Sequence, residues 1–182
     1  MRYWLRLEIL SLFVAFRAGA QSAAHRRAGE FDLTLGRHET SGGEVDNRTG
    51  VMLDVLLSAP LRASSTWVPV GGIGGGGAFG GAGDRCLLRQ GGGCAPKANF
   101  GFANVLVGAE LPLDKGALRL LAGPVLYNGA DARSVGAEVR GDAVLLPFTH
   151  FGLAVMARTT ILPSHGGQRL TASAIGGSLI LR

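Results

Sequence analysis

The segment that decides the fold class lies at residues 133–147 and reads RSVGAEVRGDAVLLP. Its three charged side chains after the first residue, Glu138, Arg140 and Asp142, stand at every second position. Successive side chains of a β-strand point to opposite faces, so a strand would collect these charges on one face and leave the other face apolar. A helix would spread the same charges around its circumference. The segment therefore predicts a strand that separates a polar face from an apolar one.

The same alternation recurs along the chain, between stretches rich in Gly, Pro, Asn, Asp and Ser. In residues 99–112, for example, Val105, Val107 and Ala109 share one face. An even number of strands lets a single-chain bacterial barrel close with both ends on the same side. The pattern predicts eight strands, at about residues 31–40, 49–60, 66–79, 99–112, 117–128, 133–147, 150–162 and 168–181.

The composition is unusual for a domain that is surrounded by water. Charged residues make up 17% of the chain, where about 25% is typical, and Lys97 and Lys115 are its only lysines. Beyond the N-terminal segment, no stretch approaches the ~20 apolar residues of a membrane-spanning helix. Part of the surface is therefore expected to face lipid. The predicted fold is all-β, a closed antiparallel eight-stranded up-and-down transmembrane β-barrel.

The N-terminal segment has the layout of an export signal. Arg2 and Arg6 precede an apolar stretch at residues 7–16, and the small residues 18–20 follow as a cleavage site. An amphipathic or transmembrane helix is the alternative, but a stretch of ten residues does not cross a hydrocarbon layer of ~30 Å. We therefore expect a signal peptide at residues 1–20, a linker at residues 21–30 and the barrel at residues 31–182.

Over residues 31–182 this pattern resembles the small eight-stranded outer-membrane proteins of the OmpA-transmembrane-domain and OmpX type. The resemblance implies a location in the cell outer membrane, where the partners are outer-membrane lipids and the barrel assembly machinery. It also implies a structural or surface-interaction role rather than an enzymatic one.

An eight-stranded barrel has an interior just wide enough to be filled by side chains, and an isolated charge buried there is very unfavourable. A two-residue turn at Asp114 and Lys115 would place Glu110 opposite Arg119, a favourable cross-strand pair. Removing both side chains should therefore destabilise the barrel less than removing Glu110 alone. We expect a structural ion-pair network that plugs the barrel, formed by Asp54, Glu110, Arg119, Glu138, Arg140, Asp142 and Arg158.

Other motifs give little sign of ligand binding. Gly72, Gly74 and Gly77 fit the dinucleotide-binding pattern, but more glycine follows instead of a helix. These glycines are better explained as places where interior side chains pack close to the strand. The arginines are scattered, which argues against nucleic acid. Cys86 and Cys94 are expected to form a disulfide in an oxidising compartment, because a zinc site would need further ligands nearby. No nucleotide, metal or other cofactor is predicted.

The four histidines, His25, His38, His150 and His165, are interpreted as exposed turn or loop residues. No Ser–His arrangement suited to nucleophilic catalysis is visible. Two alternatives stay open. One is a soluble exported lipocalin-like barrel that binds a hydrophobic ligand inside. The other is a lipid-modifying outer-membrane enzyme, which should lose activity when His150 or His165 is changed.

Aromatic residues near the strand ends are expected to form interfacial girdles. The predicted girdle near the chain termini contains Phe31, Trp67, Phe148 and Phe151, and the opposite one contains Phe79, Phe100 and Tyr127.

Overall fold

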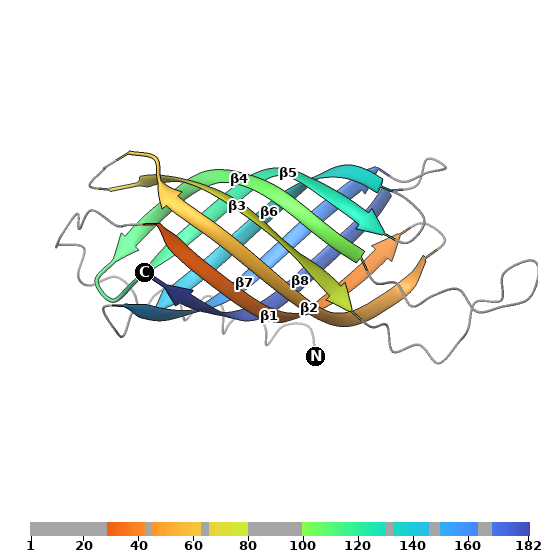
Figure 1. The fold of residues 1–182 in the computed structure, drawn as a ribbon, viewed down its shortest axis with the longest axis horizontal. Coiled ribbons are helices and arrows are strands. Elements are labelled where there is room, and N and C mark those ends of the chain that lie inside the picture. The colour runs from red at the N-terminus through yellow and green to blue at the C-terminus, as the bar shows by residue number, and fades with distance from the viewer. Residues whose placement is uncertain are drawn as a thin grey trace, which may run out of the picture.

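The computed structural model describes residues 29–42, 45–62, 66–79, 100–129, 133–145, 150–163 and 169–182. Each strand pairs antiparallel with the next in sequence, and the last pairs with the first, so the sheet closes into a barrel (Figure 1). The predicted fold is confirmed. The eight strands are β1 (Glu30–Gly42), β2 (Val45–Pro60), β3 (Val68–Phe79), β4 (Phe100–Leu113), β5 (Gly116–Gly129), β6 (Arg133–Leu145), β7 (Phe151–Pro163) and β8 (Arg169–Leu181).

The two ends of the barrel differ in what they carry. The termini end, as we call it, is the end where β1 begins, β8 finishes and the short turn joins β4 to β5. The opposite end is called the loop end. β1 begins at Glu30, the last residue of the predicted linker. The predicted signal peptide, the rest of the linker, Cys86 and Cys94 lie outside the described residues. Among the residues that are described, no helix is long and apolar enough to cross a bilayer.

The strands are staggered around the barrel. Residues that pair across successive strands form a row that runs around the barrel. The row that starts on β3 at Phe79 passes through the other seven strands and returns to β3 at Pro69, ten residues away. This stagger is the shear that tilts the strands of a closed barrel by about 35–45° from its axis. The row passes through Phe79, Val51, Arg37, Ile175, Ala157, Gly141, Leu120, Ala109 and Pro69.

The two faces of each strand are oriented as the sequence predicts. The apolar face of each strand is turned outward, so large aliphatic side chains are exposed all around the barrel, and the predicted charges are turned inward. A water-soluble domain normally has the opposite arrangement. Examples from six strands are Leu35, Leu53, Val105, Leu120, Val139 and Val155, each exposed by 43–61%.

The inward glycines of β3 leave room for neighbouring side chains. A Cβ atom at Gly74 would lie 2.6 Å from Oδ1 of Asn104, and one at Gly76 would lie 2.8 Å from Cζ of Phe102. At Gly72 it would lie 3.0 Å from a methyl carbon of Leu56. Close packing by interior side chains is therefore what these inward glycines permit, whereas Gly77, the third glycine of the motif, lies on the outward face beside Phe79.

Gly76→Ala is expected to lower the free energy of unfolding by about 1–3 kcal/mol, as overpacking typically does. The added methyl group would overlap the carbonyl oxygen of Leu53 and crowd Phe102. Gly177→Ala is the control, because Gly177 is exposed on β8 and has nothing within 4 Å of its Cβ position. Urea unfolding of both variants tests this prediction, and equal losses would contradict it.

Apolar clusters fill the interior on both sides of the charges. Towards the loop end Met52, Phe102 and Met156 belong to one cluster, and at the termini end Val144 and Ile180 belong to another. A third cluster, Leu56, Val70, Leu106 and Leu121, lies against β2 to β5. The described part of the barrel is therefore filled by side chains.

The prediction that Phe100 and Tyr127 belong to an exposed girdle at the loop end is wrong. Tyr127 is only 6% exposed and Phe100 packs against it inside the barrel, with ring centroids 4.8 Å apart. Both fall on the inward side of the alternation, which proximity to a strand end does not reveal. Trp67, Phe79 and Phe151 are exposed as expected. Phe148 lies outside the described residues.

Candidate functional site: the charged interior

Arg119 of β5 is the first centre of the interior network. The register places it opposite Glu110 of β4, and its Nη2 atom lies 3.2 Å from Oε2 of Glu110. The same guanidinium also reaches β1, where it donates to Glu30 and, at 2.8 Å, to Oδ2 of Asp32. Arg119 is 3% exposed. One buried arginine thus holds three carboxylates from two strands.

This sharing changes the expectation for the Glu110–Arg119 pair. Glu110→Ala leaves Arg119 with Glu30 and Asp32, so we expect a loss of about 1–3 kcal/mol, the usual penalty for removing one buried partner. Adding Arg119→Ala would leave two further carboxylates without their cation, so the double variant should be less stable than Glu110→Ala. A double-mutant cycle of unfolding free energies measures this. A double variant more stable than Glu110→Ala would indicate an isolated pair instead.

Arg140 of β6 is the second centre and is fully buried. Its Nε atom donates to Oδ1 of Asp142 at 3.0 Å, on the same strand. Its Nη1 atom donates across the interior to Oδ2 of Asp54 on β2 at 2.7 Å. Asp32 lies 3.9 Å from Nη2 of the same group and so connects the Arg140 and Arg119 clusters. Arg140 therefore connects β6 to β2 across the interior of the barrel.

Arg158 of β7 is the third centre. Its Nη1 atom lies 3.8 Å from Asp54 and 3.9 Å from Glu138. Its guanidinium carbon lies 3.9 Å from the centroid of the Phe102 ring, a cation–π contact. Asn104 donates to Oε1 of Glu138 at 3.1 Å. The structure thus places all seven predicted charges inside the barrel and connects them through three arginines.

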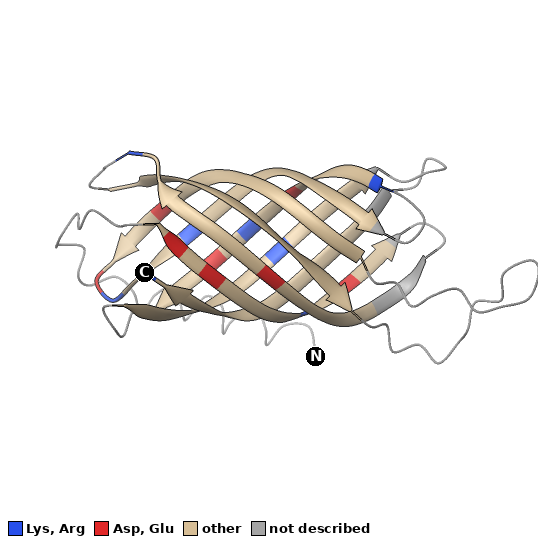
Figure 2. Cartoon of the chain, in the orientation of Figure 1, with Lys and Arg blue, Asp and Glu red and all other residues tan. Residues whose placement is uncertain are grey.

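Three interior partners were missed from the sequence: Glu30, Asp32 and Asn104. A signal for Asp32 exists, because Phe31 and Leu33 alternate with it in β1. Figure 2 shows acidic and basic positions on several strands of the barrel. Counted over the described residues, six buried carboxylates meet three buried arginines, and Arg182 adds a partner for Glu30 at 2.7 Å. Each arginine is consequently shared.

The interpretation of His38 as an exposed loop residue is wrong. His38 lies on the inward face of β1, is 3% exposed and meets the Phe100 ring edge-on at a centroid distance of 5.4 Å. His150 is exposed, and His25 and His165 lie outside the described residues. Within the described ranges, no three His, Cys, Asp or Glu side chains gather as metal ligands would.

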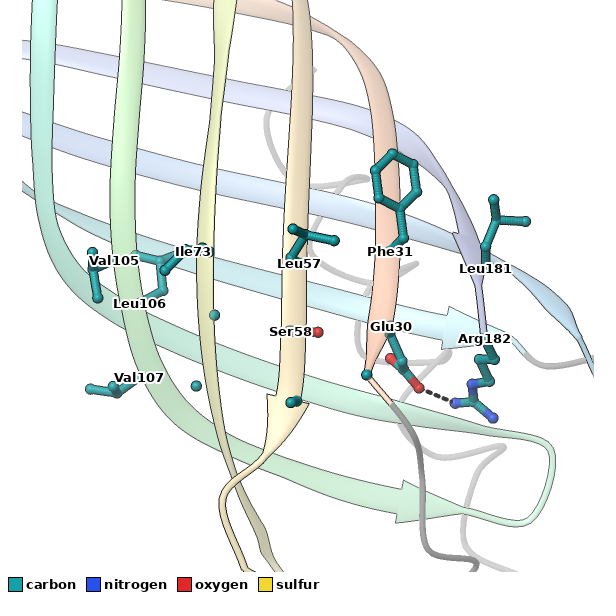
Figure 3. A pocket seen from close by; sticks show the side chains of 14 residues that line it. Glu30, Phe31, Leu57, Ser58, Ile73, Val105, Leu106, Val107, Leu181 and Arg182 are labelled. Carbon is teal, nitrogen blue, oxygen red and sulfur yellow. Dashed lines mark ion pairs between the residues drawn. The ribbon is translucent and has the colours of Figure 1, made fainter.

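A groove of about 680 Å³ lies towards the termini end, over β1 to β4 and the end of β8 (Figure 3). Small residues of β2 and β3, such as Ala59 and Gly71, are part of its lining. Its lining is apolar apart from Glu30, Ser58 and Arg182. The Glu30–Arg182 ion pair lies at one side of the groove. Such a lining suits hydrocarbon rather than a polar substrate.

Comparison with known proteins identifies a fold but not a family. No family model matches the chain, and no curated protein matches it. Neisserial surface protein A shares 8% identity with it at a TM-score of 0.56, over 84% of this chain and 96% of that one. The attachment invasion locus protein Ail of Yersinia pestis shares 12% identity at a TM-score of 0.47, over 85% and 100%.

The outer membrane protein OprG of Pseudomonas aeruginosa shares 8% identity at a TM-score of 0.48, over 86% of this chain and 98% of that one. Identities this low concern the fold alone, and the likeness to the neisserial protein is the one with a TM-score above 0.5 among these three. Together with the closed sheet, that likeness supports the resemblance seen in the sequence: this chain has the fold of the small eight-stranded outer-membrane β-barrels.

Proposed function

We propose that this chain is an exported bacterial protein whose barrel spans the outer membrane, where it has a structural or surface-interaction role. The observation that carries the proposal is the inverted distribution of side chains. Aliphatic residues such as Leu35, Leu120 and Val155 are exposed, while Arg119 and Arg140 are buried. Transmembrane barrels show an outward apolar band and a polar interior.

Lipid is the environment in which this exterior is stable. Soluble monomers rarely expose continuous apolar patches of more than a few hundred Å², whereas here every strand turns large apolar or glycine-rich faces outward. The soluble lipocalin-like alternative needs an apolar interior that receives a ligand. The described interior instead holds charges between packed apolar clusters.

The interior network is proposed to plug the barrel rather than to conduct. Its ion pairs join β5 to β1 and β6 to β2, and the clusters on either side leave little room for a solute. Surface interactions would then take place at the loop end, where residues 80–99 connect β3 to β4. A Cys86–Cys94 disulfide in that connection, a cleaved signal peptide at residues 1–20 and delivery by the barrel assembly machinery belong to the same proposal.

Gel migration of the refolded protein tests the proposal. The chain without residues 1–20, refolded into phospholipid vesicles, should migrate differently before and after boiling, because a closed barrel resists unfolding by detergent. In cells the full chain should be shortened at its N-terminus and fractionate with outer membranes. Recovery of a folded barrel in the soluble periplasmic fraction would refute membrane insertion. Hydrolysis or transfer of lipid acyl groups by the purified barrel would instead support the enzymatic alternative.

A further inference from the structure

A small polar cluster interrupts the apolar exterior near the loop end. It consists of Thr159 on β7, Ser173 on β8, and Arg37 and Glu39 on β1, all exposed. The register pairs Thr159 with Ser173 and Ser173 with Glu39. Arg37 precedes Glu39 by two residues and so shares its outward face. The four side chains therefore form one continuous patch across three neighbouring strands.

The patch is bordered by apolar side chains that face the same way, except towards the loop end, where Ser41, Thr49 and Thr171 follow. Ile161, which is 50% exposed, follows Thr159 on the outward face of β7. Arg37 pairs with Val51 on one side and Ile175 on the other, and these are 53% and 59% exposed. An arginine on the lipid face destabilises a barrel unless it lies close to the interface. Arg37 is therefore expected to mark the level at which lipid headgroups begin.

The charges of the patch are not neutralised within the described part of the molecule. Each buried arginine has carboxylate partners, but Arg37 and Glu39 form no ion pair with another described residue. Ser173 and Thr159 share a hydrogen bond of 3.4 Å. The guanidinium of Arg37 is thus available to an anion from outside the barrel.

We propose that Arg37, assisted by the hydroxyl group of Ser173, binds the phosphate of an anionic membrane lipid at the loop end of the barrel. The proposal rests on the membrane location argued above. A guanidinium offers parallel N–H donors that match phosphate oxygens. Diagonal neighbours on paired strands, such as Arg37 and Ser173, lie about 7–8 Å apart, within reach of a long side chain. The aliphatic stem of Arg37 can lie over Val51 and Ile175 while its head reaches the phosphate.

Glu39 leads to a second expectation, which concerns the strength of lipid binding. Its carboxylate shares the patch and would repel a phosphate bound at Arg37. Removing that negative charge with Glu39→Gln should therefore strengthen binding of an anionic lipid. A patch that served only to bind water would not respond in this way.

The test measures lipid selection by the barrel, refolded without residues 1–20, in vesicles of phosphatidylcholine with a minor fraction of labelled phosphatidylglycerol. The wild-type protein should enrich phosphatidylglycerol in its lipid shell, and Arg37→Gln should lower that selectivity by more than the factor of about five that the loss of one basic residue at an anionic surface causes in general. Ser173→Ala should lower it less. Arg133→Gln is the matched control, because Arg133 is exposed on the outward face of β6 at the same end and loses the same charge.

The possible outcomes distinguish a failure of this inference from a failure of the proposed function. A barrel that inserts and is heat-modifiable but does not select phosphatidylglycerol overturns the lipid site alone. Equal losses in Arg37→Gln and Arg133→Gln overturn it as well, since they indicate general charge attraction. A chain that does not insert into vesicles overturns both the membrane location and the site.

Discussion

Arg140→Ala is expected to lower the free energy of unfolding by about 3–5 kcal/mol, the usual effect of removing one partner from a buried ion pair. The variant would leave Asp54 and Asp142 buried without the cation that now lies 2.7 and 3.0 Å from them. Because both carboxylates are fully or almost fully buried, water cannot replace the lost contacts without entering the barrel.

Urea unfolding in vesicles, followed by tryptophan fluorescence, measures this loss. Arg62→Ala serves as the control, because Arg62 is exposed just beyond β2 and substitutions at such sites usually change stability by less than about 0.5 kcal/mol. A second variant, Arg140→Met combined with Asp54→Asn and Asp142→Asn, should recover much of the stability, since it removes the unpaired charges. A loss no larger than that of Arg62→Ala would show that the network contributes little.

Val155→Arg is expected to lower stability in vesicles by about 2–4 kcal/mol, as charges at the centre of the lipid face do. Val155 is 59% exposed on β7, and its partners across the sheet are Ala143 and Gly177. These small neighbours leave space for the longer side chain, so the effect reports the environment and not a steric clash.

Asn128→Arg is the matched control for Val155→Arg. Asn128 is exposed on the outward face of β5 at the loop end, where an added arginine should change stability by about 0–1 kcal/mol. Unfolding titrations of the two variants in the same vesicles measure the difference. If the barrel were surrounded by water, the two substitutions would have similar, small effects, and that result would contradict the membrane location.

Much of this fold could be predicted from the sequence because the alternation of side chains is a local property. Glu138, Arg140 and Asp142 lie on one strand, so a single segment reveals which residues share a face. The turn at residues 114–115 likewise fixes the pairing of Glu110 with Arg119 from a few residues. Strand positions and hairpin register therefore need no knowledge of the rest of the chain.

The contacts across the interior could not be predicted in the same way. Arg119 and Asp32 are 87 residues apart in sequence, and Arg140 and Asp54 are 86 apart. Their meeting depends on which strands face each other once the sheet closes with its particular shear. The inward position of Tyr127 illustrates a second limit. Its nearness to a strand end does not tell which way it points, whereas the alternation counted from Arg119, eight residues earlier on β5, places it inward.

The interior charges are also distributed unevenly along the chain. Among the described side chains, the inward-facing charges of β1 to β4 are all acidic, namely Glu30, Asp32, Asp54 and Glu110. The buried arginines come from β5, β6 and β7. A chain that has emerged only as far as β4 would therefore hold a set of acids with no internal counterion. The second half of the polypeptide brings the three buried arginines, together with Glu138 and Asp142 of β6. The acids of the first half therefore gain their counterions only when the later strands join them. A product that lacks those strands is electrostatically disfavoured.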